Sequence, residues 1–305
     1  MLSLCGGVET GLYALQQLDI PVKEYHTYEI LPEAIAVSQY HFPFVIHHGD
    51  LYEADFNQFK GFDLLLAGTC CQSLSKVRIE NKQVNNGLDG KSGIFFKAIE
   101  CLKVIQPKYF MFENVIPSRE EDLNTMTECI GVDPLLIDSA IFSAQSRERY
   151  YWTNIPEVTV PEDKKITLQS ILNDGYTPDK KAKCLRRNDS HGFYNGCGWT
   201  PIKRFHRFYY KSFGTMVFPS KEYFENCLEV TKKILNGRKS SAKIYDDYNG
   251  HDFDDARYLW KEERARLQGV PEEYVKYMSE KDAADVLGDG WTVPVIAHIF
   301  SFMKF

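Results

Sequence analysis

Short apolar runs alternate with helical patterns over about the first 155 residues of the chain. The apolar runs are MLSL, EYHTYEI, FVIHH, FDLLLAG and KYFMFENV, and the helical patterns between them include TGLYALQQL, LPEAIAVSQYHF and SGIFFKAIECLKVI. This rhythm predicts an α/β fold with a doubly wound, mostly parallel sheet. Because ligands of such sheets bind at the carboxyl ends of the strands, the residues that follow each apolar run are the candidates for function.

The pattern becomes less regular after Pro156, where prolines, a basic aromatic segment and a polar stretch follow one another. We therefore predict a first domain over residues 1–156 and a smaller, less regular second domain over residues 157–260. From Tyr258 the segment LWKEERARLQG has a helical pattern, and GDGWTVPVIAHIFSFM then reads as a loop that opens a buried helix. Residues 261–305 are expected to return to the first domain.

Composition limits the class of protein. With 305 residues, of which 44% are hydrophobic and 26% charged, the chain can bury a large core. No apolar run reaches the roughly 18 residues of a membrane span, and the N-terminus lacks the pattern of a secretory signal. Eight cysteines without pairing spacings favour reduced thiols over a disulfide framework. We therefore expect an intracellular protein without membrane contact.

A basic segment with interleaved aromatic residues runs from Lys180 to Lys211. It includes Lys203, Arg204 and Arg207, and such a segment can hold phosphates and stack on bases. The alternative, a solvated basic face over ordinary aromatic packing, fits the same residues nearly as well. The formal net charge of −6 argues mildly against a protein wholly dedicated to coating nucleic acid.

Glycines and carboxylates follow the first three apolar runs. LCGGVETG places Gly6 and Gly7 in a turn before a helix that begins near Thr10, and such a turn brings backbone amides close to a ligand. Glu29 ends the second run and Asp50 follows the third, which together suit a ligand with an adenosine part. Taken one at a time, each carboxylate is better explained as a helix cap or a solvated strand end.

Two adjacent cysteines follow the fourth run, in AGTCCQSLS, and Glu113 ends the fifth, in FMFENV. In the predicted sheet Cys71 and Glu113 lie at equivalent ends of nearby strands, so that a thiol and a carboxyl face one cleft. Positive charge from Arg147 and Arg149, in SAQSRERYYW, would favour a thiolate, and shelter would favour a protonated carboxyl. A buried structural cysteine beside a capping carboxylate is the more common situation, and the residues alone leave both interpretations open.

In order along the chain, these stretches resemble the motifs of the cytosine-5 DNA methyltransferases. LSLCGGVETG is similar to the cofactor loop of that family, YEI to its ribose-binding strand end, GDL to its adenine-binding turn and GTCCQSLS to its nucleophile loop. GKSGIFF, FMFENV, SAQSRERYYW, ARLQGVPEEY and GDGWTVPVIAHIF follow in the family's order. The chain most resembles the branch that contains the animal de novo DNA methyltransferases, as a bare catalytic unit of bacterial or phage type. This implies the Rossmann-like fold of class I methyltransferases, with residues 157–260 as a target-recognition domain.

The resemblance implies transfer of a methyl group from S-adenosyl-L-methionine to carbon 5 of cytosine in double-stranded DNA. Cys71 is expected to attack carbon 6 of a cytosine flipped out of the duplex. Glu113 is expected to hold ring nitrogen 3 and the exocyclic amine, and Arg149 the base oxygen. Arg147 is expected to support the cysteine and a nearby phosphate. The reaction needs no metal.

The same resemblance implies further contacts. The expected cofactor contacts are Cys5, Gly7, Val8, Thr10, Glu29, Ile30, Asp50, Leu51, Ile94, Trp291 and Val293. The expected DNA contacts are Ser75 and Lys76 in the loop that closes over the flipped base, Gln145, and Lys203, Arg204 and Arg207 of the second domain. The expected setting is the cytoplasm of a bacterium or a phage-infected cell, in restriction–modification or phage DNA methylation.

The chain departs from the family pattern at three positions, one of which is Asp289, where many bacterial members of the family have Asn. The family usually has proline directly before the nucleophile, where this chain has Cys70, and its animal branch has an acidic residue where this chain has Gly6. Two other functions stay open: a cytosine-5 methyltransferase of transfer RNA, and a catalytically idle homologue that binds DNA or another methyltransferase. No zinc site is expected, because four candidate ligands match no usual spacing. They are Cys184, His191, Cys197 and His206.

Overall fold

The computed structural model describes residues 1–71, 73–75, 86–187, 200–210, 214–239 and 241–304. The chain divides into two compact units. We call the first the sheet unit; it comprises Met1–Asp138, Glu148–Glu162 and Gly290–Phe305. We call the second the helical unit; it comprises Ser139–Arg147 and Asp163–Asp289.

Within the described residues of the sheet unit, seven strands form one sheet in the order β3-β2-β1-β4-β5-β7-β6. The strands are β1 (Leu2–Leu4), β2 (His26–Tyr28), β3 (Ile46–His47), β4 (Leu64–Ala67), β5 (Tyr109–Asn114), β6 (Leu135–Asp138) and β7 (Glu148–Thr153). The strands from β3 to β5 pair in parallel, and β7 runs antiparallel to its two neighbours. The predicted α/β fold with a doubly wound, mostly parallel sheet is therefore confirmed.

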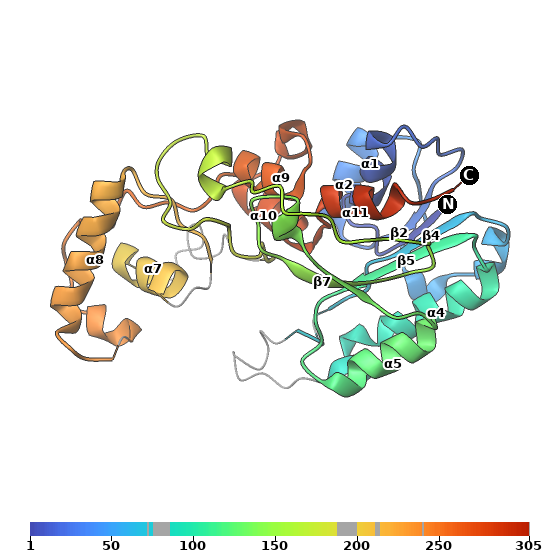
Figure 1. Cartoon of the computed structure of the whole chain (residues 1–305), viewed down its shortest axis with the longest axis horizontal. Helices are drawn as coiled ribbons and strands as arrows, with labels where there is room; N and C mark the ends of the chain where they lie inside the picture. Colours follow the sequence, from blue (N-terminus) through green and yellow to red (C-terminus); the bar gives the residue numbers. More distant parts are fainter. Residues whose placement is uncertain (72, 76–85, 188–199, 211–213, 240, 305) are drawn as a thin grey trace. The chain divides into compact units, whose positions relative to one another are not determined.

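Helices cover both faces of the sheet. They are α1 (Thr10–Gln17), α2 (Pro32–His41), α4 (Ile94–Ile105), α5 (Glu120–Ile130) and α11 (Val293–Phe300). Figure 1 shows α1, α2 and α11 on one side of the sheet and α4 and α5 on the other. Because both faces are covered, β1 and β4 are built only from buried residues, as their apolar runs predict. Helix α11, which is the buried helix predicted near the C-terminus, packs against α1, the first helix of the chain.

The core of the sheet unit lies between the sheet and the pair α4 and α5. Residues from β1, β4, β5 and β7 meet residues from the two helices in one apolar cluster. Its members include Leu4, Leu65, Phe112 and Trp152 from the strands, and Phe95, Ile99, Met126 and Ile130 from the helices. This core holds the central strands in register and so fixes where their carboxyl ends lie.

The helical unit contains less regular backbone. Its helices are α7 (Pro201–Phe205), α8 (Lys221–Leu235), α9 (Lys261–Gln268) and α10 (Glu280–Asp289), and a π-helical turn spans His206–Tyr210. Helix α8 begins where Ser220 Oγ accepts a hydrogen bond from the Tyr223 amide at 3.0 Å, and it ends at Asn236 in the left-handed conformation. No described helix of either unit combines the length and the apolar character that crossing a membrane requires.

The bounds of the two units differ from the predicted domain bounds at three places. Residues 157–162, which were predicted to begin the second domain, belong to the sheet unit. Residues 139–147 belong to the helical unit, because the 144–147 segment pairs with the chain around Ala182. Residues 261–289 also belong to it, because α9 and α10 pack against each other there. Within the predicted segment 261–305, the sheet unit includes Gly290–Phe305.

Candidate active site

The carboxyl ends of four neighbouring strands lie in one row. Leu4 of β1 pairs with Tyr28 of β2 and with Ala67 of β4, and Ala67 pairs with Phe112 of β5. The side chains that follow these residues are therefore brought to one edge of the sheet. The predicted site residues at this edge are Cys5 and Glu29, directly after β1 and β2, Cys71 in the loop after β4, and Glu113, the last residue but one of β5.

The Glu29 carboxylate is held by three backbone amides. Gly7 donates to Oε2 at 2.9 Å, and Ile30 and Leu31 donate to Oε1 at 2.8 Å and 2.9 Å. Gly7 has a φ of 59°, in the left-handed region that favours glycine, and this conformation is part of the turn that offers its amide to Glu29. The carboxylate at the end of β2 therefore has a fixed orientation and ties β2 to the turn after β1.

The other residues predicted to bind the cofactor differ in exposure. Ile30 is 63% exposed, which leaves an apolar surface beside Glu29. Asp50 is exposed and caps the next helical turn, accepting a hydrogen bond from the Tyr52 amide at 2.9 Å. Val8, Thr10, Leu51, Trp291 and Val293 are buried, and Cys5, Gly7 and Ile94 are half-buried.

Two titratable side chains belong to the turn after β1. Burial, with the nearby Glu29 carboxylate, raises the pKa of Cys5 to about 12, so this thiol stays protonated at neutral pH. Glu9 is fully buried, and burial raises its pKa to about 7 although the hydrogen bond that it accepts from the Tyr25 hydroxyl opposes the shift. No sequence pattern indicated a buried carboxyl at Glu9, because a glutamate between two glycines of a turn is ordinarily solvated.

The loop after β4 is anchored to β5. Asn114 Nδ2 donates to the carbonyl and the hydroxyl of Thr69 at 3.1 Å and 3.2 Å. The amides of Leu74 and Ser75 donate to the Cys71 carbonyl at 3.0 Å and 3.1 Å, which ties this part of the loop to Cys71. Cys70 and Cys71 are both half-buried, and no disulfide joins any described cysteine. Asn114 was not among the predicted site residues. Its position directly after Glu113 was the one sequence signal that could have indicated it.

The Glu113 carboxylate lies between an arginine and an indole. Arg149 Nε is 3.1 Å from Oε1, and Trp291 Nε1 donates to Oε2 at 2.8 Å. Tyr151 of β7 pairs with Glu113, and Arg149 lies two residues before it on the same strand, so their side chains share a face. The side chains of Glu113 and Arg149 are only 10% and 13% exposed, which strengthens their attraction relative to a solvated pair.

Arg147 and Gln145, which the sequence assigns to catalysis and DNA, lie inside the helical unit. Arg147 is 4% exposed and donates to the carbonyls of Leu185 at 2.8 Å and Gly288 at 3.1 Å. Gln145 has no exposed surface; it accepts from the Leu185 amide at 2.7 Å and donates to Gln268 at 3.3 Å. In this arrangement both side chains join segments of the helical unit, and Gln145 offers no surface to DNA.

The remaining predicted DNA contacts are Ser75, Lys76, Lys203, Arg204 and Arg207. Lys203 and Arg204 lie on α7, where Lys203 forms an ion pair with Asp246, and Arg207 is exposed in the π-helical turn. Ser75 is half-buried and its backbone forms a bridge with Pro117. Lys76 lies outside the described residues.

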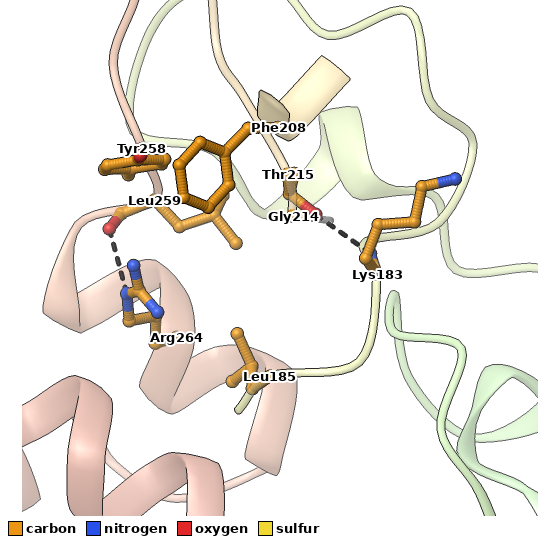
Figure 2. A pocket seen from close by; sticks show the side chains of 8 residues that line it. All are labelled: Lys183, Leu185, Phe208, Gly214, Thr215, Tyr258, Leu259 and Arg264. Carbon is orange, nitrogen blue, oxygen red and sulfur yellow. Dashed lines mark hydrogen bonds between the residues drawn. The ribbon is translucent and has the colours of Figure 1, made fainter. Parts of the chain in front are cut away.

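Figure 2 shows a small cavity in the helical unit. The rings of Phe208 and Tyr258 meet edge to face on its wall, with centroids 4.5 Å apart, and Thr215 Oγ1 accepts from the Lys183 amide at 2.8 Å. The space holds about one water molecule, which is too little for a nucleotide base. Its lining residues are Lys183, Leu185, Phe208, Gly214, Thr215, Tyr258, Leu259 and Arg264.

In the part of the chain that the structure describes, no group of three or more His, Cys, Asp or Glu side chains is placed to hold a metal ion. Of the four candidate zinc ligands that the sequence analysis rejects, His191 and Cys197 lie outside the described residues.

Curated proteins similar to this chain include type II and orphan methyltransferases of bacteria and phages. The type II methyltransferase M1.ScrFI of Lactococcus lactis subsp. cremoris is 26% identical over 282 residues, covering 83% of this chain and 64% of that protein. The orphan methyltransferase M.Rho11sI of Bacillus phage rho11s is 32% identical over 147 residues, covering 45% of this chain and 28% of that protein. The chain thus spans less than two thirds of the length of these relatives. The expected closeness to the animal de novo branch is not supported.

Solved structures show the same fold. A mutant of Spodoptera frugiperda DNMT2 superposes with a TM-score of 0.67 at 16% identity, covering 99% of this chain and 98% of that one. The Dnmt2 methyltransferase of S. pombe superposes with a TM-score of 0.65 at 19% identity, covering 98% and 96%. The family model for C-5 cytosine-specific DNA methylase matches residues 1–304, and the chain therefore belongs to that family.

Proposed function

We propose that this chain is a DNA (cytosine-5-)-methyltransferase that uses S-adenosyl-L-methionine and a covalent Cys71 adduct. The observation that best supports the proposal is the Glu113 carboxylate, held by Arg149 and Trp291 at the end of the strand next to the Cys71 loop. Nucleophilic attack on a pyrimidine requires a thiol and an oriented acid on one base. Adjoining strand ends supply both groups.

The residues around the first two strand ends fit S-adenosyl-L-methionine. Ile30, 63% exposed, offers an apolar face for adenine beside the fixed Glu29 carboxylate, which can accept from ribose hydroxyls. A side chain added at Gly7 would meet nothing within 4 Å, so the turn leaves open space for a ligand. When bound, this cofactor supplies an electrophilic methyl group.

In the proposed reaction, the Cys71 thiolate adds to carbon 6 of a flipped-out cytosine, and a carbon–sulfur bond forms. Glu113 holds ring nitrogen 3 and the exocyclic amine, and Arg149 holds the base oxygen, so the charge displaced by the attack is stabilised. Carbon 5 would then take the methyl group, whose bond to the sulfonium sulfur would break and leave its electron pair on sulfur. Carbon 5 would afterwards lose its proton to a base. The electrons of that C–H bond restore the ring double bond and break the carbon–sulfur bond, which regenerates the Cys71 thiolate.

The helical unit is proposed to read the DNA target. Lys203, Arg204 and Arg207 lie on one short helix and the turn that follows it, a placement that suits phosphate or guanine contacts. The bacterial and phage relatives favour a cytoplasmic role in restriction–modification or in methylation of phage DNA.

The proposal is tested by methyl transfer from labelled S-adenosyl-L-methionine to duplex DNA and, in parallel, to transfer RNA. We expect label in the DNA, none in the RNA, and none with Cys71→Ser. Transfer to RNA alone would establish the RNA alternative. Binding of the cofactor without transfer to either nucleic acid would establish the idle homologue. Bisulfite sequencing of DNA from cells that express the chain then identifies the methylated sites.

A second assay tests the covalent step. Duplex DNA that contains 5-fluorocytosine should form a stable adduct in the presence of the cofactor, because fluorine at carbon 5 cannot leave as a proton does. Peptide mapping should place the adduct on Cys71. An adduct on Cys70 would reverse the assignment of the nucleophile.

A further inference from the structure

Trp291 touches three parts of the sheet unit that are far apart in the sequence. Its indole Nε1 donates to Glu113 Oε2 at 2.8 Å, and its backbone amide donates to Thr10 Oγ1 at 3.4 Å. A side-chain carbon at Gly68 would lie 2.9 Å from Trp291 Cζ2, and one at Gly11 would lie 3.2 Å from Cζ3. The indole therefore packs directly on the backbone that begins the Cys71 loop and on the first turn of α1.

The two groups that donate to the Glu113 carboxylate differ in charge. Arg149 brings a positive charge to Oε1, whereas the indole N–H brings a neutral donor to Oε2. One donor on each oxygen fixes the plane of the carboxylate, and removing either one frees rotation about its last bond. Trp291 is only 9% exposed, so water cannot readily replace its indole N–H as a donor to Glu113.

We propose that Trp291 is a positioning residue for methyl transfer, which acts by holding the Glu113 carboxyl in the orientation that a flipped cytosine requires. This inference rests on the proposed function. It gives Trp291 a task on the base side of the site, in addition to the place in the cofactor pocket that the family resemblance implies. Because the ring also packs on Gly68, the same side chain sets the start of the nucleophile loop relative to Glu113.

The test variant is Trp291→Phe, which keeps an aromatic ring at the position and removes the N–H donor. One hydrogen bond to a charged group predicts a fall in kcat of about 10- to 100-fold, with the Kd of S-adenosyl-L-methionine changed less than about threefold. The rate of adduct formation with 5-fluorocytosine DNA should fall by the same factor as kcat, since Glu113 acts on the attack by Cys71.

The matched control is Trp152→Phe. Trp152 of β7 is fully buried, and its Nε1 donates to Thr127 Oγ1 of α5 at 3.0 Å. The change therefore removes an indole hydrogen bond, here to a neutral hydroxyl, without touching Glu113. This variant should keep kcat within about twofold of the native value even if its melting temperature falls. Replacement of Trp291 by benzothienylalanine, in which sulfur takes the place of the N–H, repeats the test without a change of shape.

The outcomes separate the inference from the proposed function. If the native chain transfers methyl groups to DNA and both Trp291 variants keep kcat within twofold, the positioning role is wrong and the proposed function stands. If the variants lose cofactor affinity while kcat at saturating cofactor is unchanged, Trp291 serves the cofactor pocket alone and the inference is again wrong. If the native chain binds the cofactor and transfers to no nucleic acid, the proposed function itself fails.

Discussion

The backbone amide of Gly7 donates to Oε2 of Glu29 at 2.9 Å, which joins the turn after β1 to the end of β2. Both partners of the bond belong to the chain itself, so the chain's own backbone orients the carboxylate that the proposed cofactor would meet. Preorganisation of this kind lowers the cost of binding because fewer groups are ordered when the ligand arrives.

Glu29→Gln should therefore weaken the binding of S-adenosyl-L-methionine. An amide has one acceptor oxygen where the carboxylate has two, so the variant cannot keep its bonds to Gly7 and to Ile30 and still accept from a ribose. We expect the Kd, measured by isothermal titration calorimetry, to rise about 10- to 100-fold. Glu100→Gln, an exposed change on α4, should leave it unaltered. An unaltered Kd in Glu29→Gln would contradict the assignment of the ribose site.

The two adjacent cysteines should respond differently to substitution. Cys71→Ser should lower kcat by at least about 1,000-fold, because a serine hydroxyl is a far weaker nucleophile than a thiolate. Cys70→Ala should keep most of the activity, since the loop is held by Asn114 through Thr69 rather than by the Cys70 side chain. Initial rates of methyl transfer from labelled cofactor, measured for both variants, show which cysteine is the nucleophile. Loss of activity in Cys70→Ala together with survival in Cys71→Ser would make Cys70 the nucleophile.

The stability of the sheet unit should depend on pH through Glu9. Burial raises the pKa of Glu9 to about 7 in the folded chain from about 4.5 when unfolded, so the folded state holds the proton more tightly. The resulting stabilisation is complete below about pH 4.5 and is lost as the pH rises through about 7. Glu9→Gln cannot ionise and keeps an acceptor for the Tyr25 hydroxyl.

The free energy of unfolding, measured in urea, should be higher for Glu9→Gln than for the native chain by up to about 3 kcal/mol at pH 8. At pH 5 the two free energies of unfolding should differ little. The exposed change Glu53→Gln should show no such dependence on pH. Equal effects of Glu9→Gln at the two pH values would show that Glu9 does not hold its proton more tightly in the folded chain.

Arg147 should contribute to the stability of the helical unit. Arg147→Met leaves the buried carbonyls of Leu185 and Gly288 without their donor, at a cost of about 1–3 kcal/mol for each group. Arg238→Met is the matched control, because exposed Arg238 also donates to two carbonyls, which water can solvate in its absence. We expect the control to cost less than about 0.5 kcal/mol by chemical denaturation. Similar costs for both variants would rule out the structural role of Arg147.

The centre of the parallel part of the sheet was predictable because β1, β4 and β5 are built from apolar runs whose residues are buried. β7 was harder to recognise, because Glu148–Thr153 opens with charged residues and alternates less clearly. β6 is equally hard to predict from the sequence, because it is short and lies at the edge of the sheet, where Leu136 is 46% exposed. Patterns of hydrophobicity report burial on both faces, and edge or antiparallel strands lack that signal.

For the candidate site, the sequence indicated which residues lie at strand ends. It did not indicate which side chains form hydrogen bonds or ion pairs with them. The bond between Trp291 and Glu113 joins residues 178 positions apart, and no local pattern reports such a pairing. Spacing within SAQSRERYYW also could not show that Gln145 and Arg147 turn inward, because burial of a polar side chain depends on distant carbonyls and amides that satisfy it.

The sheet unit is drawn from three separate stretches of the chain, and the third brings Trp291 and α11. A ribosome adds residues in order, so β5 and its Glu113 emerge well before the stretch 290–305 that completes their surroundings. Until then α1 lacks the helix that packs on it and Glu113 lacks its indole donor. A nascent chain would therefore acquire an ordered site only after this stretch has been made.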